Sequence, residues 1–137
     1  MDFLTEEAVY KKTPQQLTAL LYEGLIDSLE EAIENTKKSN YIHANKRLQK
    51  ANDILRRLGV GLNYDAGIIA HQLDALYNYM AERLIEANMK KDVAMMQEVL
   101  TIAKDIANAW NEALKKQPTI NTAAKKAATY EQFIMTE

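Results

Sequence analysis

Apolar side chains recur every three or four positions in four long stretches of the chain, the spacing of a helix that buries one face. The stretches cover about residues 14–34, 41–58, 65–87 and 92–117. A helix of such length is about 30 Å long. The stripe of the first stretch consists of Leu17, Leu20, Leu21, Leu25, Leu29, Ala32 and Ile33.

Residues at the ends of these stretches indicate where the helices begin and end. Thr13 suits the position that caps a helix N-terminus, Pro14 suits the first helical position, and Gln16 can complete a capping box. Asn88 is predicted to end the third helix in the left-handed conformation, and Asp92 to cap the fourth.

The connections between the predicted helices are short, which favours antiparallel neighbours. The sequence therefore predicts an all-α fold, an up-down-up-down four-helix bundle over residues 13–116. Residues 1–12 are expected to be a flexible N-terminal segment, and residues 117–137 a tail with a short extra helix near 122–134. The core is expected to include Leu17, Leu21, Leu73, Leu100 and Trp110.

Charge supports the pairing of the first two helices. The first carries five acidic residues and no basic one between positions 23 and 34, whereas the second carries five basic residues against Asp53 alone. Side-by-side placement would set opposite charges together and would help to fix register.

Composition excludes several classes of function. The 137 residues contain no Cys, which excludes thiol catalysis and Cys-based metal sites, and the net charge of −2 gives no general attraction to nucleic acid. The acidic N-terminus does not resemble a signal peptide, and no apolar run approaches the ~20 residues of a membrane span. We therefore expect a soluble cytoplasmic protein that does not insert into membranes.

Motifs for chemistry are missing from the chain. His43 and His71 are the only histidines, and neither lies in a metal-binding pattern of helical bundles. No nucleophile-elbow or phosphate-binding motif occurs. The sequence predicts no catalytic, metal or cofactor site and no small-molecule substrate, with an enzyme or a nucleic-acid regulator kept as weaker alternatives.

Tyr and Met are concentrated in the third predicted helix and at the start of the fourth. Core packing accounts for part of this set. Tyr77 and Tyr79, however, are two positions apart and cannot share one helix face, so one is expected to pack and the other to be presented. Tyr and Met on a helical surface suit the capture of a partner helix in an apolar groove.

Two segments resemble the FliS family of flagellar secretion chaperones. Thr13 to Leu17 and Leu21 to Gly24 read TPQQL and LYEG, similar to the family's S/T-P-x-x-L…L-Y-D-G opening. Leu76 to Asp92 reads LYNYMAERLIEANMKKD, similar to the family's L-Y-D-Y-M-x-R-R-L-x-E-A-N-x-K-x-D, with Glu82 where Arg is usual. Trp110 matches the family's late Trp.

The resemblance implies a chaperone that binds the disordered C-terminal segment of flagellin, prevents its premature polymerisation and presents it to the flagellar export gate. The alternative is a bundle-type secretion chaperone or adaptor for another exported appendage protein. The residues expected to form or shape the client-binding groove are Tyr22, Leu25, Ile69, Leu76, Tyr77, Tyr79, Met80 and Leu84.

The N-terminal segment suggests a further hypothesis. Its apolar residues Phe3, Leu4, Val9 and Tyr10 precede a strong helix cap, so the segment could cover the groove when no client is bound. The tail around 130–135 is a rival cover, or a contact to a second chain.

Overall fold

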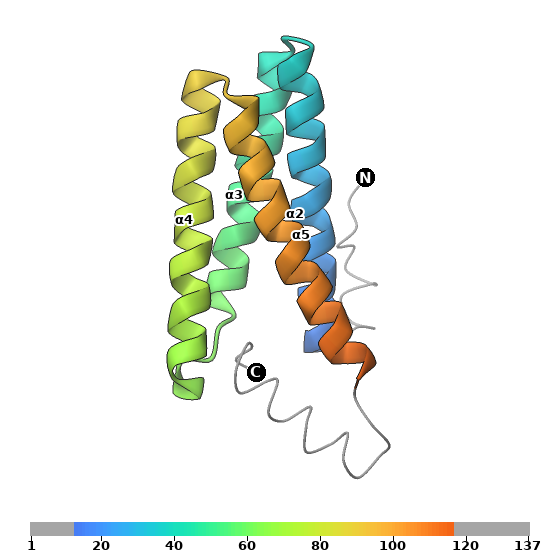
Figure 1. Ribbon diagram of the computed structural model, residues 1–137, viewed down its shortest axis with the longest axis vertical. Helices are drawn as coiled ribbons and strands as arrows, with labels where there is room; N and C mark the ends of the chain where they lie inside the picture. The colour runs from blue at the N-terminus through green and yellow to red at the C-terminus, as the bar shows by residue number, and fades with distance from the viewer. Residues whose placement is uncertain (1–12, 117–137) are drawn as a thin grey trace.

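The computed structural model describes residues 13–116, which form an all-α bundle of four long helices (Figure 1). They are α2 (Pro14–Lys37), α3 (Tyr41–Val60), α4 (Ile68–Lys90) and α5 (Val93–Lys115). A short 3-10 helix, η1 (Tyr64–Ala66), lies between α3 and α4. The predictions made for residues 1–12 and for the tail from 117 onward lie outside the described residues.

Helix α2 begins with the predicted capping box. The Thr13 hydroxyl accepts from the Gln16 backbone N–H at 3.2 Å, and the Thr13 N–H donates to the Gln16 side chain at 3.0 Å. Helix α5 begins in a related way, because the Asp92 carboxylate accepts from the Met95 N–H at 3.1 Å. These side chains satisfy backbone donors that a helix N-terminus leaves unpaired.

The predicted end of α4 was wrong. Asn88 lies inside the helix, which continues to Lys90, and Lys91 adopts the left-handed conformation with φ 53°. The Asn88 side chain instead donates to Asn45 of α3 at 2.7 Å. A tertiary contact, which single-sequence capping rules do not contain, thus holds Asn88 in the helix.

The helices pack as a square in which the extensive contacts are between neighbouring helices rather than across the diagonals. Helix α2 packs against α3 and α5, and α4 packs against the same two helices. Successive helices run in opposite directions, as the colours in Figure 1 show. The α2–α3 contact is the most extensive and the α4–α5 contact the least. The core is fully closed around Leu29, Ala51, Leu84 and Val99, one from each helix.

Most of the predicted core residues lie in the core. Leu100 and Trp110 are buried, and Leu21 and Leu73 are partly buried against the core cluster. Leu17 is only partly buried and is not among the residues packed on that cluster. The apolar residue Ile42 is 75% exposed because it lies in the first turn of α3, at the end of the bundle.

The predicted complementarity between α2 and α3 is present as one close ion pair. Arg47 Nε lies 2.6 Å from Glu31 Oε2, whereas Arg56 and Arg57 pair with Asp53 on their own helix. Glu30 of α2 faces Lys104 of α5 at 3.6 Å. All of these side chains are substantially exposed, so the pairs contribute to register more than to stability.

Candidate functional site: a groove between α3 and α4

The surface is hollowed along the line where α3 meets α4. Two cavities of about 400 and 230 Å³ lie there, and Asn52 of α3 lines both. We call the two cavities together the seam groove. It runs from Tyr64, just before α4, to Met89, near the end of that helix.

The floor of the seam groove is the outer side of the core. Leu55 and Tyr77 line the larger cavity, Leu48 and Leu84 line the smaller, and all four are buried. A partner that enters the groove would therefore contact apolar surface already held rigid by the bundle.

The two ends of the groove carry apolar side chains that project into solvent. Val60 is 75% and Tyr64 43% exposed at one end, and Ile85 is 55% and Met89 79% exposed at the other. Exposed apolar side chains along one hollow are typical of a site that binds a partner. Met and Tyr also adapt to varied apolar surfaces.

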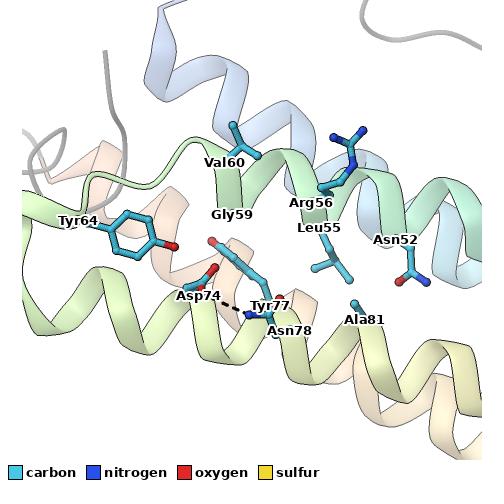
Figure 2. Close-up of a pocket in the computed structure, with 10 residues that line it drawn as sticks. All are labelled: Asn52, Leu55, Arg56, Gly59, Val60, Tyr64, Asp74, Tyr77, Asn78 and Ala81. Atoms are coloured by element: carbon cyan, nitrogen blue, oxygen red, sulfur yellow. Dashed lines mark hydrogen bonds between the residues drawn. The ribbon is translucent and has the colours of Figure 1, made fainter.

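Small residues open the larger cavity. Figure 2 shows Gly59 on α3 and Ala81 on α4, with Asn52 pointing from α3 towards α4 near Ala81. A Cβ added at Gly59 would lie 3.5 Å from Asp74 Oδ1, an ordinary contact distance. The space beside Gly59 is therefore real but only about one methyl group deep. The Arg56 side chain points away from α4 (Figure 2).

Two buried amide oxygens are the groove's most unusual feature. Within residues 13–116, the only buried side-chain nitrogen or oxygen atoms without a hydrogen bond are Asn52 Oδ1 and Asn88 Oδ1. Asn52 lines both cavities and Asn88 lines the smaller. Buried polar atoms are normally paired, since an unpaired acceptor costs about 1–3 kcal/mol.

Polar side chains also gather where the groove meets η1. Asp74 Oδ2 accepts from the Asn78 amide at 3.3 Å, and the Tyr64 ring lies 5.0 Å from the His71 ring. Partial desolvation raises the pKa of Tyr64, and a hydrogen bond with Asp74 raises it further. Tyr64 thus stays a neutral hydrogen-bonding group at the mouth of the groove.

The opposite face of α4 is tied to α5 by a polar cluster. The Tyr79 hydroxyl donates to Glu98 Oε2 at 2.5 Å, and Arg83 donates to Glu98 Oε1 through Nε at 3.0 Å and Nη2 at 2.6 Å. The Tyr79 hydrogen bond, followed by those from Arg83, lowers the pKa of Glu98. This cluster holds α4 against α5, where helix packing is least extensive.

The eight predicted client-binding residues fall into two groups. Tyr22, Leu25, Tyr77, Met80 and Leu84 are buried in the core, where they can shape a surface from beneath. Leu76 is partly buried against the core, while Ile69 and Tyr79 are exposed. Tyr77 packs and Tyr79 is presented, as their spacing indicated. The structure brings only Tyr77 and Leu84 of the eight to the seam groove.

Sequence reasoning assigned no binding role to the asparagines or to Ile85. A signal for them exists, because Asn45, Gln49 and Asn52 recur every three or four positions and so form one polar stripe along α3. Ile85 and Met89 are one turn apart on α4, off its main apolar stripe. A second, weaker stripe on each of two adjacent helices is the pattern that marks the groove.

The phenols of Tyr22 and Tyr77 meet in the core beneath the groove. Their hydroxyls hydrogen-bond to each other at 2.7 Å, and the Tyr22 ring meets the Trp110 ring edge to face at 6.4 Å between centroids. Burial raises the pKa of Tyr22 to about 12, although the hydrogen bond from Tyr77 opposes the rise. Burial raises the pKa of Tyr77 as well. This pair is a structural contact between α2 and α4.

Among residues 13–116, no three His, Asp or Glu side chains are grouped as metal ligands. His43 and His71 both lie on the surface, on α3 and α4. No helix in this range is long and apolar enough to cross a membrane.

Taken together, these features define a class: a four-helix bundle with an open groove between two adjacent helices, a kind of surface on which helical partners can lie. The family model described as flagellar protein FliS matches residues 4–117. The chain is 31% identical over 112 residues to the flagellar secretion chaperone FliS of Bacillus subtilis, covering 82% of this chain and 84% of that protein. The Escherichia coli FliS is 34% identical over 111 residues, with coverage of 80% and 82%. The chain belongs to the FliS family of flagellar secretion chaperones.

Proposed function

We propose that this protein is a cytoplasmic export chaperone that holds the disordered C-terminal segment of flagellin in the seam groove. Binding would keep flagellin from polymerising early and deliver it to the flagellar type III export apparatus. The protein performs no catalysis in this role. The observation that carries the proposal is a groove with a buried apolar floor and four exposed apolar side chains at its ends, in a member of a flagellar chaperone family.

The physics of the groove suits a client that folds as it binds. A disordered segment loses conformational entropy on ordering, so it needs a long apolar surface for useful affinity. The seam groove follows α4 from residue 74 to residue 89, the greater part of a helix that spans residues 68–90. A helix lying along it would bury one apolar face from end to end.

The exposed residues Ile69 and Tyr79 offer a second possible contact surface on α4, outside the groove. A long client could contact both. The Tyr79 hydroxyl is already bonded to Glu98, however, whereas Ile85 and Met89 contribute apolar surface directly to the groove. The groove is therefore the proposed primary site, and Ile69, Leu76 and Tyr79 form a secondary one.

Calorimetric titration with the C-terminal ~40–60 residues of the host's flagellin tests the proposal, since a helix of ~20 residues already spans the ~30 Å bundle. We expect saturable 1:1 binding, a strongly negative heat-capacity change, and a gain in helicity by circular dichroism. Tyr79→Ala should weaken binding less than Ile85→Ala does.

No binding at tens of micromolar would contradict the flagellin assignment. The client would then be another exported appendage protein, to be sought with the same groove variants. Binding without a heat-capacity change would contradict capture on an apolar surface.

A further inference from the structure

We infer that Asn52 and Asn88 fix the register in which the client binds: the seam groove selects a segment with two hydrogen-bond donors about seven residues apart. This inference rests on the proposed function and concerns the same site. An apolar groove alone discriminates poorly between positions of a sliding helix. Two fixed acceptors inside it would give each position a different energy.

Both acceptors are buried without a partner in the bundle, so a hydrogen-bond donor for them has to come from outside it. Neither Asn52 Oδ1 nor Asn88 Oδ1 has a hydrogen-bond partner within the described residues. The Asn88 amide nitrogen is held by Asn45 Oδ1 at 2.7 Å, which fixes the orientation of the Asn88 oxygen. A donor on the client would satisfy each oxygen while apolar client side chains fill the space between them.

The spacing of the acceptors follows from the helix geometry. Asn45 and Asn52 are seven positions apart on α3, a rise of about 10 Å. Because Asn88 is bonded to Asn45, its oxygen lies near the level of Asn45 along the groove. A client helix alongside α3 repeats the same face every seven residues. Asn, Gln, Ser or Thr at two such positions would meet both oxygens.

A shift of the client by one turn, about 5.4 Å, would place apolar side chains against the acceptors and client donors against Leu48, Leu55 or Leu84. Both groups of polar atoms would then be buried without partners. Single buried polar side chains fix the register of coiled coils in this way. The asparagines would therefore contribute to specificity more than to total affinity.

Asn52→Leu is the sharpest variant, because it replaces an amide whose oxygen has no partner to lose. Asn108→Leu is its matched control, since Asn108 is an exposed asparagine on α5 that lines neither cavity of the groove. Asn88 is tested by the double variant Asn45→Leu/Asn88→Leu, which removes both ends of their hydrogen bond and leaves neither unpaired.

The experiment is a titration of each chaperone variant with the flagellin C-terminal segment and with versions in which its Asn, Gln, Ser and Thr residues are replaced singly by Ala. Asn52→Leu should weaken binding of the unchanged segment roughly tenfold, as expected for one lost buried hydrogen bond, and Asn108→Leu less than about twofold. One client substitution should weaken binding to the wild-type chaperone but not to Asn52→Leu.

At a second client position, about seven residues from the first, a substitution should weaken binding to the wild-type chaperone but not to Asn45→Leu/Asn88→Leu. Asn52→Leu binding as tightly as wild type, or more tightly, would overturn the inference and leave the proposed function standing. If the two client positions identified in this way lay at another spacing, the proposed register would be wrong. A segment that does not bind the wild-type chaperone would overturn both the inference and the flagellin assignment.

Discussion

In the part of the core beside α2, buried polar atoms are hydrogen-bonded within the described bundle, whereas in the seam between α3 and α4 two of them are not. Beside α2, the Trp110 indole N–H donates to the Gln15 carbonyl at 3.1 Å and the Thr36 hydroxyl to the Ala32 carbonyl at 2.7 Å. In the seam, Asn52 and Asn88 keep unpaired oxygens. Both regions are apolar and both are close to the core.

The difference separates stability from binding. Buried polar atoms that are hydrogen-bonded within the bundle add to its stability, whereas a buried polar atom without a hydrogen bond can gain one from a bound partner. The first region should therefore respond to mutation by unfolding, and the second by losing its client while staying folded.

The largest expected effect is the contrast between a core leucine and a groove isoleucine. Leu29→Ala should lower the free energy of unfolding by about 2–5 kcal/mol, because Leu29 is fully buried and its removal leaves a cavity. Ile85→Ala should lower it by less than about 0.5 kcal/mol, since Ile85 is 55% exposed. Urea denaturation measures both, and equal losses would remove the distinction between the regions.

Alkaline pH should lower the stability of the folded protein through Tyr22, which lies in the part of the core beside α2. The folded-state pKa of Tyr22 is raised from 10.0 to about 12, so its stabilising contribution is fully present below pH 10 and is lost as the pH rises towards 12. A shift of this size corresponds to about 3 kcal/mol. Urea unfolding at pH 8 to 12 measures it. The control is Tyr22→Phe/Tyr77→Phe, whose stability should fall less steeply; an equal slope would contradict the assignment.

The two phenols should also be coupled to each other. Tyr22→Phe or Tyr77→Phe alone leaves one buried hydroxyl without its partner and should lower stability by about 1–3 kcal/mol. The double variant should lose less than the sum of the two, because no hydroxyl remains unpaired. Urea denaturation of all four proteins measures the coupling, and strict additivity would mean that the 2.7 Å contact contributes nothing.

Two glycines give the smallest expected effect and differ in sign. Gly59→Ala should raise stability by up to about 1 kcal/mol, since a Cβ there meets only Asp74 Oδ1 at 3.5 Å and Ala favours the helix. Gly67→Ala should lower stability by about 1–2 kcal/mol although nothing lies within 4 Å, because its φ is 88°. Thermal unfolding compares them, and a loss at Gly59 would show that the groove wall has no spare space.

The fold could be predicted from the sequence because its signals are local. Apolar periodicity located all four helices, and the caps at Thr13 and Asp92 set two boundaries correctly. The error at Asn88 arose because its side chain is used across the bundle by Asn45. Capping rules describe one helix at a time and cannot include such a partner.

The groove could be predicted only in part. Tyr77 and Leu84, two of the eight predicted residues, line the groove, yet periodicity cannot tell a core face from a second apolar face on the same helix. Asn52 reads in the sequence as an ordinary polar surface residue. Only the packing of α3 on α4 reveals that its oxygen is buried without a partner.

The most direct test of the central claim, that the seam groove holds the client, compares two equivalent substitutions on α4. Ile85→Glu places a charge in the groove, while Ile68→Glu places one on an isoleucine that is more exposed, 72% against 55%, and does not line it. With both variants as helical and as stable as wild type, calorimetric titration with the flagellin segment should show binding lost or weakened at least tenfold for Ile85→Glu only, as expected for a desolvated charge. Unchanged affinity for Ile85→Glu, or an equal loss for Ile68→Glu, would contradict the claim.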